Sequence, residues 1–170
     1  MTKPEKSEYD AYYGKYISLV EDGDLFATLA AQPDELNAAL GSLDDAKGLY
    51  AYAPDKWTIK EVISHLNDGE RMFGYRAFRI SRGDTTPIEG FEQDGYIENA
   101  RPNARSLSHL LDEFRLLRKA NMFLLNNLND EDMKRMGTAS GLPISVRALA
   151  NIMGGHVTHH ANILQAKYFA

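Results

Sequence analysis

The segment Ser145–Leu164 reads SVRALANIMGGHVTHHANIL, and its apolar residues recur with the spacing of a helix that has one buried side. At about 100° per residue, one set of side chains lies within roughly 40° of a single line along the helix. Ser145 is a favourable N-cap residue, and we expect the helix to run to about Tyr168. The segment thus predicts a helix with two histidines in its apolar stripe, which consists of Leu149, Met153, His156, His160 and Ile163.

Two adjacent glycines, Gly154 and Gly155, interrupt this segment. On the same helical projection both fall on the outer flanks of the stripe. Each costs roughly 1 kcal/mol relative to alanine in a helix interior, so their presence needs a reason. The alternatives are close approach of a neighbouring helix or of a second subunit, a local kink, or a break of the helix after Met153.

Two further helices have clear starting signals. Thr58-Ile59-Lys60-Glu61 is a capping box that follows Trp57, and this second helix should stop near SRGD, where Gly83 is a plausible C-terminal cap. Ser106 is expected to begin the third helix. Between them, residues 84–104 form a long polar connection, which in a compact domain is usually functional or a crossover.

The remaining segments complete an all-helical pattern. Residues 8–41 show helical spacing with an expected break at EDGD (residues 21–24), and Pro33 should end or restart a helix. DEDMKRMGTASGLP (residues 130–143) is interpreted as a second connection, and no segment alternates in the manner of a strand. The sequence therefore predicts an all-α fold, a four-helix bundle with one long crossover connection, as a single domain over residues 1–170.

The histidines of the predicted helices are candidate metal ligands. His156 and His160 are four residues apart, which places them one turn apart on one face, a spacing that suits two ligands of one ion. His65 lies at the margin of the second helix's apolar stripe and completes a set of three if the two helices are neighbours. His159 lies at the edge of the stripe, and His109 should be solvated.

A structural alternative stays open for these histidines. The HxxxH spacing also occurs by chance, and a single buried histidine is often a hydrogen-bonded core residue. Burying two neutral imidazoles without partners costs on the order of 1–3 kcal/mol each, and a bound metal would remove that cost.

Composition narrows the classes of function. The chain has 170 residues, a formal net charge of -5 and no cysteine, so a metal would be bound by nitrogen and oxygen donors. The acidic balance argues against nucleic-acid binding, and no run approaches the roughly 18 apolar residues of a membrane span. The N-terminal MTKPEKSEYD lacks the apolar core of a signal peptide, so we expect a cytoplasmic protein.

The segments WTIKEVISHLNDGERMFGYRAFRISRGD and SVRALANIMGGHVTHHANIL together resemble the DinB-like (YfiT-like) superfamily. This resemblance implies a four-helix bundle with a crossover connection, often dimeric. It also implies a metal site made by a histidine of the second helix and an HxxxH pair of the last, which correspond to His65, His156 and His160. Some members of the superfamily are metal-dependent transferases or isomerases that use low-molecular-weight thiols such as bacillithiol or mycothiol.

Three imidazole ligands leave a coordination position open, which is typical of a catalytic site. We expect a divalent ion, Zn or Ni, that lowers the pKa of a water or thiol, with metal affinity falling below about pH 6. The hypothesis is a transferase that activates a small thiol for an electrophilic substrate, or a hydrolase that activates water. The alternative is a non-catalytic, dimeric, metal-binding stress-response module. Because Val157 rather than glutamate follows the first histidine of the pair, HExxH protease chemistry is excluded, and the candidate bases are Asp68, Glu70 or a residue of the 84–104 connection.

Overall fold

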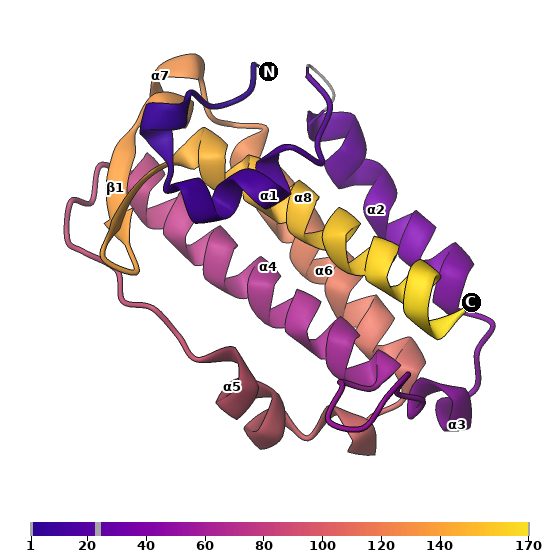
Figure 1. Cartoon of the computed structure of the whole chain (residues 1–170). Coiled ribbons are helices and arrows are strands. Elements are labelled where there is room, and N and C mark those ends of the chain that lie inside the picture. The colour runs from indigo at the N-terminus through magenta and orange to yellow at the C-terminus, as the bar shows by residue number, and fades with distance from the viewer. Residues whose placement is uncertain (1, 23–24, 170) are drawn as a thin grey trace.

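The computed structural model describes residues 2–22 and 25–169. Its long helices are α2, α4, α6 and α8, and the shorter elements lie between or beside them (Figure 1). Part of the predicted break at EDGD, Gly23 and Asp24, lies outside the described residues. The bounds are α1 Gly14–Ile17, α2 Leu25–Leu40, α3 Asp45–Gly48, α4 Ile59–Ser81, α5 Gln93–Ala100, α6 Leu107–Leu125, α7 Asp130–Lys134, β1 Met136–Ala139, β2 Leu142–Ser145 and α8 Val146–Ile163, which a π-helical turn continues over Leu164–Tyr168.

The four long helices form the predicted bundle. One apolar cluster joins the beginning of α2 and α8 to the end of α4 and α6, and a second cluster joins the opposite ends. Hence α4 and α6 run in one direction, and α2 and α8 run in the other. Helices α4 and α8 pack against each other, as do α2 and α8 and the parallel pair α4 and α6 (Figure 1).

Because α4 and α6 are parallel, the chain must return along the bundle between them. The 84–104 connection does this on the outside of α4, and it includes the helix α5 and a 3-10 turn at Pro102–Ala104 (Figure 1). The crossover prediction is confirmed, although the connection contains more helix than its polar composition indicated.

The predicted helix starts are also confirmed. The Thr58 hydroxyl accepts a hydrogen bond from the Glu61 amide at 3.1 Å, and the Glu61 carboxylate accepts one from the Thr58 amide at 2.7 Å. Ser106 and Ser145 cap α6 and α8 by accepting from the third amide of each helix. Gly83, with a φ of 80°, follows the end of α4 as a C-terminal cap.

Pro33 does not end a helix, contrary to the prediction, since α2 is continuous from Leu25 to Leu40. Proline has no N–H for the carbonyl four residues earlier, which here belongs to Leu29. Arg118 of α6 supplies the missing donor, because its Nη1 lies 2.8 Å from the Leu29 oxygen. A tertiary hydrogen bond thus replaces the helical one.

Residues 136–145 form a β-hairpin where the sequence was interpreted as a connection. Met136 pairs with Ser145 and Ala139 with Leu142, so Ser140 and Gly141 alone make the turn, both with positive φ. Two-residue turns of this kind favour glycine because both central residues adopt positive φ. Ile88 of the crossover connection hydrogen-bonds to Thr138 and Ser140, which fixes the connection to the hairpin.

The predicted N-terminal helix is replaced by 3-10 turns at Lys6–Glu8 and Ala11–Tyr13 and by the single turn of α1. This segment packs across α8, where Gly154 and Gly155 are buried rather than on an outer flank. A Cβ on Gly155 would lie 1.9 Å from the Tyr16 carbonyl oxygen. Gly155 therefore admits close approach of a segment of the same chain, and α8 is not broken at Met153.

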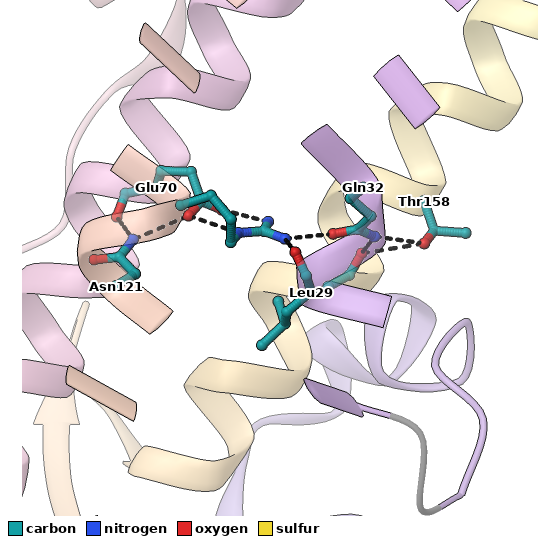
Figure 2. Close-up of polar contacts among 7 residues, drawn as sticks. Leu29, Gln32, Glu70, Asn121 and Thr158 are labelled. Carbon is teal, nitrogen blue, oxygen red and sulfur yellow. Dashed lines mark hydrogen bonds and ion pairs between the residues drawn. The ribbon is translucent and has the colours of Figure 1, made fainter. Parts of the chain in front are cut away.

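A buried polar network connects all four long helices (Figure 2). Arg118 of α6 donates to both carboxylate oxygens of Glu70 on α4, at 3.0 and 2.7 Å, and to the side-chain oxygen of Gln32 on α2 at 2.7 Å. Gln32 in turn donates to the Gly154 carbonyl and to Thr158 on α8. Gly154 and Thr158 flank His156. The network therefore fixes the position of the histidine-bearing turn of α8 along the bundle axis relative to the other helices.

Among the residues that the structure describes, no helix combines the length and apolar character needed to span a membrane.

Candidate metal centre

The side chains of His65, His156 and His160 converge between α4 and α8. One ligand nitrogen from each ring can be chosen so that all lie within 4.8 Å of one another. The Nε2 atoms of His65 and His156 are 2.9 Å apart. Two nitrogens bound to one tetrahedral ion at about 2.1 Å would lie about 3.4 Å apart, so a shared ion would require these two rings to separate by only about half an ångström.

The three rings are held as neutral imidazoles. Burial lowers the pKa of His65 to about 4 and that of His160 to about 3. The pKa of His156 is lowered well below its usual range, first by burial and then by its histidine neighbours. A metal ion requires neutral imidazole, so the site keeps its donors available where an exposed histidine would be protonated. We therefore expect proton competition for the metal nearer pH 4 than pH 6.

Few ring nitrogens of the three histidines take part in hydrogen bonds with the described residues. Within the described part of the chain, the contact between His65 and His156 is the one side-chain hydrogen bond recorded for the cluster. No backbone carbonyl or carboxylate accepts from the rings there, so the alternative of three separately satisfied core histidines does not fit the geometry. Three converging imidazoles, two of them buried and in contact through their nitrogens, are a donor set suited to a divalent ion.

Aromatic rings surround the cluster. The indole of Trp57 lies 4.8 Å from the His65 ring, and Tyr16 and Phe73 contact His156 edge-on at 5.4 and 5.7 Å between centroids. Contact between these rings and the histidines depends on tertiary packing that helical spacing does not encode.

Gly69 makes room for one of the rings. It lies one turn after His65 on α4, and a Cβ at this position would lie 3.1 Å from both Cε1 and Nδ1 of His156. This is tighter than ordinary van der Waals contact. The absence of a side chain at Gly69 thus sets how closely α8's histidine approaches α4.

Two pockets reach the histidine cluster from different sides. One of about 340 Å³, here termed the tyrosine pocket, is lined by His65, His156 and Phe73 together with Tyr12, Tyr13 and Tyr16. The other, of about 280 Å³ and termed the Trp57 pocket, includes Trp57, His160 and Tyr168. Gln93, at the start of α5, lines both pockets. The crossover connection therefore borders the approach to the cluster.

The two acidic residues predicted as candidate bases, Glu70 and Asp68, do not line the pockets that reach the histidine cluster. Glu70 faces α6, where its carboxylate accepts hydrogen bonds from Arg118 and Asn121, so it is not brought to the cluster. Asp68 is half-buried, and burial raises its pKa while Arg71 opposes that change. Among the described residues, neither carboxylate lines the tyrosine pocket or the Trp57 pocket.

The other two histidines are not among the converging ligands. His159 contacts the rings of Tyr16 and His160 edge-on, at 5.4 and 5.2 Å, but it is not one of the converging ligands. His109 is exposed on α6, as predicted.

The fold and the cluster together define a crossover four-helix bundle with a three-histidine site between α4 and α8. The chain belongs to the DinB superfamily, whose family model matches residues 28–164. The family resemblance inferred from the sequence is confirmed.

Two individual relatives extend this comparison. A protein of Geobacillus thermodenitrificans strain NG80-2, named as a candidate metal-dependent hydrolase, is 29% identical over 142 residues, which cover 79% of this chain and 76% of the relative. The solved structure of YfiT from Bacillus subtilis matches with a TM-score of 0.75 and 20% identity, over 96% of this chain and 92% of that one. It is described as "a probable metal-dependent hydrolase with an unusual four-helix bundle topology". At that identity the match establishes the fold alone.

Proposed function

We propose that His65, His156 and His160 bind a divalent metal ion, Zn or Ni, and that the protein is a metal-dependent hydrolase of small molecules. The observation that carries this proposal is the convergence of three imidazoles from two helices within 4.8 Å. The names of the Geobacillus relative and of YfiT support the reaction class.

The residues of the chain fit such an ion. When bound, a divalent ion would polarise a substrate oxygen and lower the pKa of a water molecule toward neutrality. The histidines supply neutral donors, and the rings of Trp57, Tyr16 and Phe73 shield them from bulk water. The tyrosine and Trp57 pockets give a substrate two routes to the cluster.

Hydrolysis also needs a group that accepts a proton from the attacking water, and the acidic candidates from the sequence are Glu70 and Asp68. Glu70 is committed to Arg118, so its loss would act on stability rather than on proton transfer. Asp68 lies one turn after His65 on α4 and burial raises its pKa, but it lines neither pocket, so its role as a base needs a direct test. An Asp68→Asn variant that binds metal normally but loses turnover would support this assignment.

Metal content tests the ligand assignment. We expect about one equivalent of Zn or Ni per chain after reconstitution, measured by inductively coupled plasma mass spectrometry. His65→Ala, His156→Ala and His160→Ala should each lose most of it, and the exposed His109→Ala is the matched control that keeps it. Full metal retention in all three variants would overturn the proposal.

Turnover tests the reaction class. The reconstituted protein is assayed on p-nitrophenyl esters, anilides and phosphate esters, with and without a low-molecular-weight thiol, before and after chelation. Hydrolysis that disappears on chelation while the fold survives supports the hydrolase. Turnover that requires the thiol indicates a thiol transferase instead. Absence of turnover, together with unfolding on chelation, indicates a non-catalytic metal-binding module.

A further inference from the structure

The tyrosine pocket extends along α4 from the histidines to Arg76. Arg76 is 2% exposed, yet it lines this pocket with His65 and His156. Gly69, which touches His156, precedes Arg76 by seven residues, which corresponds to about 10 Å along the helix. The pocket therefore has a buried cation at one end and the candidate metal ligands at the other.

Arg76 differs from the other buried arginines in its partners. Arg118 and Arg147 each donate to both oxygens of a carboxylate, Glu70 and Glu8 respectively. Arg76 instead uses Nη2 to donate to the Glu89 carbonyl at 3.0 Å and to the Ser140 hydroxyl at 2.9 Å. Within the described residues it forms no ion pair, and its buried Nε has no hydrogen-bond partner.

A buried guanidinium without a carboxylate is costly unless an anion neutralises it. Burial accordingly lowers the pKa of Arg76, while the nearby Tyr13 favours the charged form. Glu92 also lines the pocket, but its carboxylate oxygens accept from the amides of Asp94 and Gly95 as the N-cap of α5. Glu92 therefore does not neutralise Arg76, whose Nε–H has no acceptor among the described residues.

Aromatic side chains line the pocket between its two ends. Phe73 lies between Gly69 and Arg76 on α4, and Tyr13, Tyr16 and Phe91 line the same pocket. These rings can pack against a hydrocarbon or ring of a ligand, while the tyrosine hydroxyls and Gln93 offer it polar partners.

We propose that Arg76 binds the carboxylate of a small monocarboxylate substrate, whose reacting group lies about 10 Å away at the histidine cluster. The placement of the substrate's reacting group at the histidines rests on the proposed metal-dependent function, whereas the binding of its carboxylate by Arg76 does not. Guanidinium N–H groups match carboxylate oxygens in geometry and charge, so this interaction would fix both the class and the orientation of the substrate.

Two hydroxamates of matched chain length test the proposal on the zinc-loaded protein. Suberic acid monohydroxamate carries a terminal carboxylate, and octanohydroxamate does not. By isothermal titration calorimetry we expect the carboxylate to tighten binding about tenfold or more. Arg76→Met should remove this difference, and Arg82→Met, an exposed arginine of the same chain segment, should keep it. Equal affinity of both probes for the wild-type protein would overturn the proposal.

A second measurement avoids variants that fail to fold. In the metal-free wild-type protein, the ¹⁵N–¹H signal of the Arg76 Nε should shift on titration with octanoate and stay fixed on titration with octanol. A signal that octanoate leaves unmoved would overturn the anion site. If octanoate shifts it but zinc does not bind, the anion site stands and the proposed metal function fails. If zinc binds, and the two hydroxamates then bind the zinc-loaded protein with the same affinity as each other, the proposed metal function stands and the anion site fails.

Discussion

The α-carbon of Gly155 faces the backbone of Tyr16 so closely that a Cβ there would lie 1.9 Å from the Tyr16 carbonyl oxygen. Backbone cannot rotate away as a side chain does, so Gly155→Ala must displace α1 from α8. Overpacking of this kind costs about 1–3 kcal/mol or more, which exceeds the roughly 1 kcal/mol gained in helix propensity. We expect a lower midpoint in thermal unfolding and loss of the Tyr16 contact with His156.

Gly154→Ala is the matched control for that variant. A Cβ at Gly154 would meet the Val20 side chain at 3.3 Å, a contact that a small adjustment can relieve. The gain in helix propensity should then offset most of the cost, so the midpoint stays close to that of the wild type. Equal destabilisation by both substitutions would contradict the role assigned to the approach of α1.

The stability of the metal-free protein should fall as the pH is lowered from 6.5 toward 4. In this window the unfolded chain binds protons at the clustered histidines, with an ordinary pKa of 6.5, and the folded chain does not. Protons therefore favour the unfolded state, and stability returns above pH 6.5. For His65, whose pKa is lowered to about 4, the effect corresponds to roughly 3 kcal/mol.

Urea unfolding between pH 4 and 8 measures this slope. His65→Leu should flatten it, because an apolar side chain has no proton to bind in either state. The exposed His109→Leu should leave it unchanged. A wild-type slope that matches the His65→Leu slope would show that the cluster does not titrate as its burial requires.

Much of the architecture could be predicted because the decisive signals are local. The capping box at Thr58 and the serine caps at Ser106 and Ser145 act within one turn, so their residue types indicate where helices begin. The spacing of His156 and His160 also follows from a single helix. Their convergence with His65 required one further assumption, that α4 and α8 are neighbours, and the structure has them packed together.

The features that were missed depend on contacts between distant segments. Pro33 is tolerated because Arg118, far along the chain, satisfies the Leu29 carbonyl. Helical projection put Gly155 on an outer flank because it assumed one buried side, whereas α8 is covered on all sides over its first three turns. The hairpin had a usable signal in Ser140-Gly141, but strands of four residues are too short for their alternation to stand out.

The ion pair between Arg118 and Glu70 should dominate the stability of the bundle. Both side chains are 2% exposed, so Arg118→Met leaves the Glu70 carboxylate buried without its cation. Among the described residues only the Asn121 amide still donates to that carboxylate, and the Leu29 carbonyl loses its donor. Breaking a buried pair in this way costs about 3–5 kcal/mol.

Arg115→Met on the same helix removes an exposed pair with Asp34 and should cost less than about 1 kcal/mol. Chemical unfolding of both variants measures the difference, and a small effect of Arg118→Met would contradict the structural role of the network.

Gly69→Ala should weaken metal binding more than it weakens the fold. The added methyl group would lie 3.1 Å from Nδ1 and Cε1 of His156, so the ring must move by a few tenths of an ångström away from residue 69. Because a ligand displaced from its productive geometry loses affinity, we expect about tenfold weaker zinc binding in a competition titration. Alanine also favours the helix by up to about 1 kcal/mol, so the unfolding midpoint should change little.

Gly14→Ala adds the same methyl group in α1, where nothing lies within 4 Å, and it should leave zinc affinity unaltered. If Gly69→Ala binds zinc as tightly as the wild type, the position of the His156 ring does not control the centre.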